Sequence, residues 1–369
     1  MKILNIFDIL YQFFKKIFFI LRHKVNGLYK KVFFENKMNQ KVLQNNKDSF
    51  AAFVDLNRQS PNFNLLDYFL YIKEIARDKN LFLIILPLEK FENPKLPERD
   101  NVFFDLRLKS ILTPLIDLVF KNNVTVIFAE DRKKIEFFFN FSASQKFPSD
   151  ASYFKINDTF ILTRKLFEKM QKDNKRCLID RNIYLEQFFE KKFCQINFNK
   201  LIVISLRLSS YNKVATSNKN LWLEFKKWLI SKNYEVIILT DYENLEQATE
   251  LNKDKPELIN LSTLCSIDLV FRKILQDKSL MNFATGSGIN QLLYFSESRY
   301  IVVKFSCDHL KNSKGSGTLN SIIEQQNLSL GEQIPFSNKN QKIFWGLESE
   351  NIDLLKKEFL DFEQKYKNQ

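Results

Sequence analysis

Residues 200–222 of the chain read KLIVISLRLSSYNKVATSNKNLW, and this stretch gives the clearest indication of the fold. Leu201–Ile204 is an uninterrupted apolar run without charge, which is typical of a buried strand in a parallel sheet. We expect this strand to end just before Arg207 and a helix to begin near Trp222. In an open α/β sheet, ligands bind beyond the carboxyl ends of the strands. The polar loop between these two elements is therefore where we expect a ligand.

The same alternation of strand and helix extends through both halves of the chain. In the second half we expect strands over 235–239, 258–261, 279–284 and 300–305, with helices between them. In the first half we expect strands over 50–56, 81–87 and 124–128, with helices over 64–76 and 106–120. This rhythm predicts an α/β protein with two Rossmann-like domains facing a cleft.

The length of 369 residues exceeds one ordinary core and suits two domains. We expect a basic amphipathic segment at 1–40, a first Rossmann-like domain at 41–195 and a second at 196–335. Residues 336–369 are expected to form a C-terminal helix that packs back across the domains.

The composition excludes several classes of protein. The net charge of +13 invites a nucleic-acid partner, but the basic residues are scattered through nearly every segment, so we expect none. Four widely spaced cysteines and two histidines form neither a disulfide framework nor a zinc site. The scarcity of histidine also argues against a Ser-His-Asp or Cys-His hydrolase.

The first 35 residues have two interpretations. Apolar residues recur there at helical spacing, and residues 1–40 carry eight Lys/Arg against Asp8 and Glu35, a net charge of +6. The segment could be a first helix packed on the protein's own core, or a helix lying in an anionic membrane surface. Its longest uncharged run, Ile17–Leu21, is too short to span a bilayer.

Two features at predicted strand ends suggest an anion site. Arg207 carries forked donors that suit a phosphate, although a structural ion pair would also explain it. The turn Thr285-Gly286-Ser287-Gly288 lets the backbone approach a ligand, and Ser287 could cap the helix that follows. An ordinary strand-to-helix turn without a ligand is the alternative.

Other polar residues are candidates because they lie in the same loops or follow other predicted strands. Asp55, Glu130 and Asp131 could each act as a general base, or could cap a helix or pair with a nearby arginine. In the second half the candidates for ligand contacts are Tyr211, Asn218, Asp241 and Ser262. Asp241 could bind a ribose or cap the next helix.

Taken together, these patterns resemble bacterial GT-B glycosyltransferases of surface polysaccharide synthesis. The segment LIVISLRLSSYNKVATSNKNLWLEFKKWLISKNYEVIILTD is similar to the opening of their donor domain. MNFATGSGINQLLYFSESRYIVVKF is similar to their later donor-phosphate turn, and DLNRQSPNFNLLDYFLYI resembles part of their first domain. The resemblance covers most of residues 50–365 at the level of pattern.

The resemblance implies a metal-independent transferase without a cofactor. A nucleotide-sugar donor would lie against the second domain, with Arg207 and the Gly286–Gly288 backbone at its phosphates. The first domain would take a glycan or lipid-linked acceptor, with the protein in the cytoplasm on the inner face of the membrane. The alternatives are a nucleotide-sugar 2-epimerase of the same architecture and a non-catalytic membrane-associated scaffold with a degenerate cleft.

Overall fold

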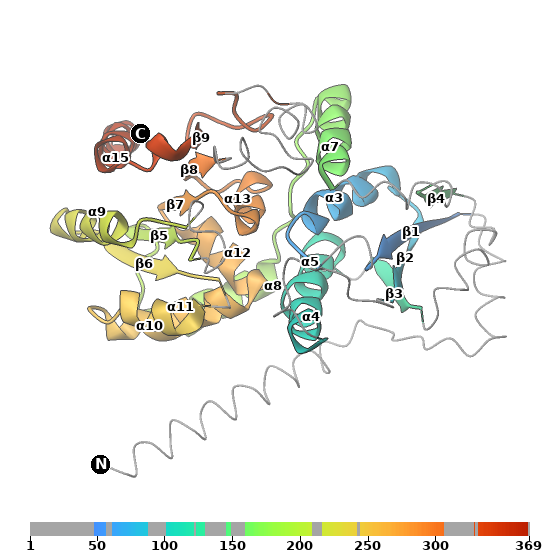
Figure 1. Cartoon of the computed structure of the whole chain (residues 1–369), viewed down its shortest axis with the longest axis horizontal. Coiled ribbons are helices and arrows are strands. Elements are labelled where there is room, and N and C mark those ends of the chain that lie inside the picture. Colours follow the sequence, from blue (N-terminus) through green and yellow to red (C-terminus); the bar gives the residue numbers. More distant parts are fainter. Residues whose placement is uncertain are drawn as a thin grey trace, which may run out of the picture. The chain divides into compact units, whose positions relative to one another are not determined.

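The computed structural model describes residues 48–56, 61–87, 101–121, 123–129, 145–148, 159–208, 216–241, 244–305, 328 and 331–367. The chain divides into two compact units. One contains 1–58, 78–90 and 122–156, and the other contains 59–77, 91–121 and 157–369. The expected α/β class with two parallel sheets is confirmed, one sheet in each unit (Figure 1).

The first unit is built on a four-stranded parallel sheet in the order β3-β2-β1-β4. Its strands are β1 (Ser49–Asp55), β2 (Asn80–Leu86), β3 (Val124–Phe128) and β4 (Gln145–Phe147). The first three lie where the apolar runs predicted them. β1 is buried along its whole length, which explains why its sequence, SFAAFVD, does not alternate between polar and apolar residues.

Six of the described helical segments from the first half and the middle of the chain belong to the second unit. They are α3 (Leu65–Ile75), α4 (Asn101–Arg107), a π-helical stretch (Leu108–Leu112), α5 (Thr113–Phe120), α7 (Thr159–Asp173) and α8 (Ile183–Lys192). Phe69 of α3 packs edge-on against Phe120 of α5, with ring centroids 5.5 Å apart. The helices predicted over 64–76 and 106–120 correspond to α3 and to the run from α4 to α5.

The second sheet has five parallel strands in the order β6-β5-β7-β8-β9. Its strands are β5 (Leu201–Ser205), β6 (Glu235–Leu239), β7 (Met281–Thr285), β8 (Tyr300–Phe305) and β9 (Gln341–Trp345). The sheet begins at β5, grows outward to β6 and then returns across β5 to β7. The carboxyl ends of β5 and β7 therefore form a topological switch point, the place where such sheets bind ligands.

Helices cover both faces of the second sheet (Figure 1). On one face, α9 (Lys219–Ser231) and α15 (Ile352–Lys367) enclose a core in which Trp222, Phe283 and Phe359 are fully buried. On the other face, α8, α11 (Pro256–Ile267) and α12 (Leu269–Lys278) enclose a second core around Leu239 and Phe271. The short helix α10 (Leu245–Leu251) follows β6. The two apolar faces explain why these strands carry almost no charge.

One predicted strand is wrong. Residues 258–261 lie inside helix α11, which has Pro256 in its first turn. Leu258, Leu261 and Cys265 all point into the core, which is a spacing of a helix and not of a strand. A short apolar run does not distinguish a buried strand from a buried helix segment, and Pro256 was the signal for a helix start.

Candidate functional site at the carboxyl edge of the second sheet

Arg207 lies at the switch point, two residues after the end of β5. Its guanidinium Nη1 donates to the carbonyl oxygen of Gly286, just beyond the neighbouring strand β7, over 3.4 Å. Among the residues that the structure describes, no carboxylate lies within ion-pair distance of Arg207. The structural ion pair considered for this residue is therefore not found there. A partly exposed guanidinium without a counter-ion is suited to bind an anion.

Hydroxyl groups connect Arg207 to the end of β7. The Ser217 hydroxyl accepts a hydrogen bond from the Arg207 backbone N–H over 2.9 Å and donates to Thr285 Oγ1 over 2.8 Å. The Ser217 backbone N–H donates to the Arg207 carbonyl over 2.8 Å. These bonds tie both ends of the loop after β5 to each other and to β7. Arg207 and Thr285, predicted from separate stretches of sequence, are thus brought together.

A buried ion pair between Lys304 and Glu350 holds the segments at this edge of the sheet together. Lys304 Nζ lies 2.8 Å from Glu350 Oε2 and also donates to the Thr216 carbonyl over 2.9 Å. The other carboxylate oxygen of Glu350 accepts from the Trp222 indole over 2.7 Å and from the Asn218 backbone N–H over 2.9 Å. A buried ion pair is stable when its remaining hydrogen-bonding groups are satisfied in this way.

Ser217, Lys304 and Glu350 were not among the predicted site residues. A signal for Lys304 was present, because it is the only charged residue in the otherwise apolar strand YIVVKF. Glu350 lies far along the chain from Lys304, and only the fold places it at the N-terminus of α9. There its carboxylate occupies the position where an anionic ligand would otherwise accept from the helix.

The two glycines of the 285–288 turn differ in how closely neighbouring segments approach them. A Cβ on Gly286 would lie 2.3 Å from the backbone oxygen of Lys304 in β8. A Cβ on Gly288 would lie 3.2 Å from Cβ of Phe63. The Gly286 N–H donates to the Val303 carbonyl over 2.7 Å. Close approach of the Lys304 backbone therefore accounts for Gly286, whereas a Cβ on Gly288 would require only a small shift of the Phe63 side chain.

Ser287 does not cap the helix that follows it. Its backbone is extended and its side chain makes no capping hydrogen bond to the short helical segment Gly288–Asn290. The predicted cap is therefore wrong. Instead, Asn290 holds the turn by donating from Nδ2 to the Thr285 carbonyl over 2.7 Å.

Asn218 and Asp241 lie at the same edge of the sheet. Asn218 is the N-cap of α9, and its side chain accepts from the Leu221 N–H over 3.3 Å. Asp241 follows β6, close to the fully buried Arg272 of α12, whose Nη1 donates to the Thr240 carbonyl over 2.9 Å. Burial lowers the pKa of Arg272 to about 10, while the Asp241 carboxylate acts in the opposite direction.

Ser262 lies inside the unit. It is fully buried on α11, and its hydroxyl donates to the Ile238 carbonyl over 2.6 Å and accepts from Asn252 Nδ2 over 3.0 Å. The prediction placed Ser262 at a strand end because residues 258–261 were assigned to a strand. In the helix its side chain supports the backbone of β6.

The candidate bases lie in the first half of the chain. Asp55 is the last residue of β1 in the first unit and is 1% exposed. Glu130 and Asp131, and Tyr211 in the second half, lie outside the described residues. Their predicted roles remain predictions.

A buried polar cluster lies next to the 285–288 turn. Asp67 of α3 accepts a hydrogen bond from the Thr163 hydroxyl of α7 and one from Gln291 Nε2 over 3.3 Å. The same Gln291 amide donates to Asn64 Oδ1 over 3.3 Å. Burial raises the pKa of Asp67 to about 7, and the Thr163 hydrogen bond opposes this only in part.

The described residues contain no group of three or more His, Cys, Asp or Glu side chains that could hold a metal ion. Within the same ranges, no helix is both long enough and apolar enough to cross a bilayer.

Comparison with solved structures returns glycosyltransferases. The chain is similar to E. coli ADP-heptose lps heptosyltransferase II, with a TM-score of 0.45, 10% identity, 87% of this chain covered and 99% of that chain. For E. coli heptosyltransferase WaaC with ADP the TM-score is 0.43 at 10% identity, covering 85% and 99% of the two chains. For a glycosyl transferase of family 9 from Veillonella parvula the TM-score is 0.40 at 7% identity, covering 70% and 81%. No family model and no curated protein matches the sequence.

Proposed function

We propose that this protein is a glycosyltransferase that takes its sugar from a nucleotide-sugar donor. The observation that carries the proposal is Arg207, whose guanidinium lies at the switch point of a five-stranded parallel sheet with no carboxylate of the described residues within ion-pair distance. Ligands of such sheets bind at this point, and an arginine there is suited to a diphosphate. The acceptor in this proposal is a cell-envelope glycan or a lipid-linked glycan.

Transfer of a sugar from a nucleotide requires a fixed positive group at this edge of the sheet. As the sugar leaves its nucleotide, negative charge develops on the departing diphosphate, and a fixed positive group stabilises it. Arg207 would supply that charge in our proposal, taking the part that a metal ion plays in other transferases. Ser217 holds the Arg207 backbone, and the Gly286 carbonyl accepts from its guanidinium over 3.4 Å, so the side chain is oriented toward β7 before a ligand binds.

The acceptor hydroxyl must lose a proton during the transfer, and a carboxylate is the usual base. Asp55 at the end of β1 remains our candidate among the described residues.

The proposal is tested by ligand-induced thermal stabilisation. We expect one of the nucleoside diphosphates ADP, GDP, UDP and CDP, or its sugar conjugate, to raise the Tm of the protein. At a ligand concentration of about 100 times Kd, the stabilisation is about 2.7 kcal/mol. Arg207→Ala is expected to abolish the shift, and the same measurement with EDTA tests independence of metal ions.

Arg164→Ala serves as the matched control. Arg164 is an exposed arginine of α7 whose one ion pair among the described residues is with Glu168 on its own helix, so its loss should leave the shift intact. If no nucleotide or nucleotide sugar stabilises the wild-type protein, the proposal is wrong. Product analysis with the donor alone separates transfer from epimerisation.

A further inference from the structure

Helix α8 exposes large apolar side chains on the face that points away from the core. Ile183 is 63% exposed, Tyr184 is 85% exposed and Phe188 is 53% exposed. Together with Gln187, Lys191 and Lys192, which are also exposed, they form one side of the helix, the α8 face. Phe189 on the opposite side is fully buried in the core with Phe271. The core of the second unit is therefore filled from the Phe189 side of α8, whereas on the α8 face the Phe188 ring stacks on Phe271 with centroids 6.4 Å apart.

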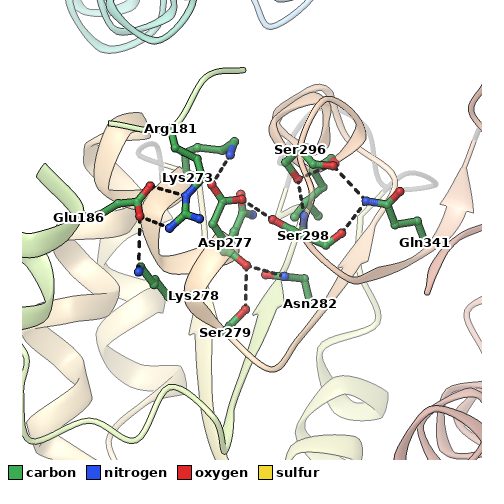
Figure 2. Close-up of polar contacts among 12 residues, drawn as sticks. Arg181, Glu186, Lys273, Asp277, Lys278, Ser279, Asn282, Ser296, Ser298 and Gln341 are labelled. Atoms are coloured by element: carbon green, nitrogen blue, oxygen red, sulfur yellow. Dashed lines mark hydrogen bonds and ion pairs between the residues drawn. The ribbon is translucent and has the colours of Figure 1, made fainter. Parts of the chain in front are cut away.

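The acidic residues of α8 are neutralised from within the protein. Arg181 Nε donates to Glu186 over 2.9 Å, and Lys278 lies 3.4 Å from Glu186 and 2.7 Å from Glu190. Figure 2 shows Glu186 held between Arg181 and Lys278. These contacts remove the negative charge that would otherwise repel an anionic surface.

The basic residues at the end of the helix remain available. In the part of the chain that the structure describes, neither Lys191 nor Lys192 forms an ion pair. Counting Arg181, Lys278, Lys191 and Lys192 against Glu186 and Glu190 gives four cations and two anions around the α8 face. The face is therefore apolar along one part and net positive around it.

We propose that the α8 face lies against an anionic lipid surface. Tyrosine and phenylalanine bury their rings at the level of lipid headgroups, and lysines extend their apolar stems while their ammonium groups reach the lipid phosphates. A convex helix face with unpaired lysines beside aromatic rings suits a deformable charged surface. A protein groove would instead require apolar anchors over successive turns, and the third turn of α8 carries Lys191 and Lys192. This inference does not depend on the proposed activity.

The test uses the full chain and vesicles of phosphatidylcholine, with or without phosphatidylglycerol. We expect the wild-type protein to sediment with the anionic vesicles, and a variant carrying both Tyr184→Ser and Phe188→Ser to bind them about ten-fold more weakly. Lys191→Glu combined with Lys192→Glu should weaken binding to anionic vesicles and leave binding to neutral ones unchanged. Circular dichroism melts verify that each variant is folded.

Two controls keep the result specific to α8. Leu106→Ser combined with Leu360→Ser removes two other exposed leucines, on α4 and α15, and should leave vesicle binding unchanged. Tyr184→Trp adds a probe whose fluorescence brominated lipids should quench beyond the quenching seen with the wild-type tryptophans.

Four outcomes would overturn the proposal. The first is equal vesicle binding by the Tyr184/Phe188 double variant and the wild type, and the second is the absence of extra quenching in Tyr184→Trp. The third is failure of the wild-type chain to bind vesicles at all. The fourth is loss of all binding when residues 1–35 alone are removed. The last outcome would assign the membrane contact to the N-terminal segment.

Discussion

Asp67 is a carboxyl group buried between helices α3, α7 and α13 (Gln291–Tyr294), with Thr163 and Gln291 as its hydrogen-bond donors. Its pKa is raised from 3.8 to about 7 because burial disfavours the charged form. In the unfolded chain the carboxyl ionises at the ordinary value. The native state therefore binds more protons than the unfolded state between these two values, and stability falls as the pH rises through this window.

We predict that Asp67→Asn removes this dependence. The variant keeps the shape of the side chain but cannot ionise, so its stability relative to the wild type should increase from pH 4 to above pH 7. Urea unfolding at a series of pH values measures the difference. Parallel curves for the two proteins would show that Asp67 keeps an ordinary pKa.

Arg207 illustrates what a single residue reveals before the fold is known. Its chemistry, a forked cation after a buried strand, identified it as an anion ligand, but an ion pair explained it equally well. Whether Arg207 forms an ion pair or is available for an anion depends on which side chains lie near its guanidinium. Gly286 and Ser217 are the neighbours in the structure, from β7 and from the far end of the loop.

At the scale of elements, the contact between β7 and β8 controls the candidate site. Gly286 follows β7, and its N–H donates to Val303 while its Cα packs on the backbone of Lys304. The Lys304 backbone is held in turn, because its N–H donates to the Ser349 hydroxyl over 2.7 Å. Any side chain at position 286 would push these strand ends apart.

We predict that Gly286→Ala destabilises the protein by about 1–3 kcal/mol, because an added methyl would clash with a backbone that cannot move aside. Since the Gly286 carbonyl also holds Arg207, the nucleotide-induced Tm shift should decrease as well. Gly288→Ala is the matched control, where the neighbouring atoms belong to the Phe63 side chain and can shift. Equal Tm values for the two variants would contradict this explanation.

Helix α8 contributes a buried aromatic residue to the core of the second unit. The predicted domain boundary at 195/196 lies after α8, yet Phe189 is part of the core on the α11/α12 side of the second sheet. Its ring packs with Phe193 at 4.9 Å, Phe271 at 5.7 Å and Phe198 at 5.9 Å between centroids. The second sheet thus obtains part of its core from a segment that precedes it in sequence.

At the scale of the whole molecule, this packing gives a prediction about stability. Phe189→Ala should lower the free energy of unfolding by about 3–5 kcal/mol, because it leaves a cavity among the three aromatic rings of Phe193, Phe198 and Phe271. The adjacent Phe188→Ala removes an exposed ring that only stacks on Phe271, and should cost far less. Chemical denaturation compares the two, and similar losses would mean that α8 does not belong to this core.

The sequence alone determined the α/β class and most strands of both sheets. Strands buried on both faces are predominantly apolar runs, and such runs are visible locally as Phe50–Leu56, Leu201–Ile204 and Tyr300–Phe305, with Asp55 and Lys304 as the charged exceptions. The interpretation failed where the local pattern was ambiguous, as at 258–261. There the run is equally compatible with a helix, and burial against the sheet selects the helix.

The assembly of the candidate site depends on the tertiary structure. Arg207, Ser217, Thr285, Lys304 and Glu350 are separated by up to 143 positions between Arg207 and Glu350. They meet because parallel strands bring their carboxyl ends to one edge, and because the last helix returns over the α9 face of the second sheet. Local residue patterns specify local backbone states, whereas contacts between distant residues depend on strand order and packing. For this reason Arg207 was visible in the sequence, and the ion pair that supports its surroundings was not.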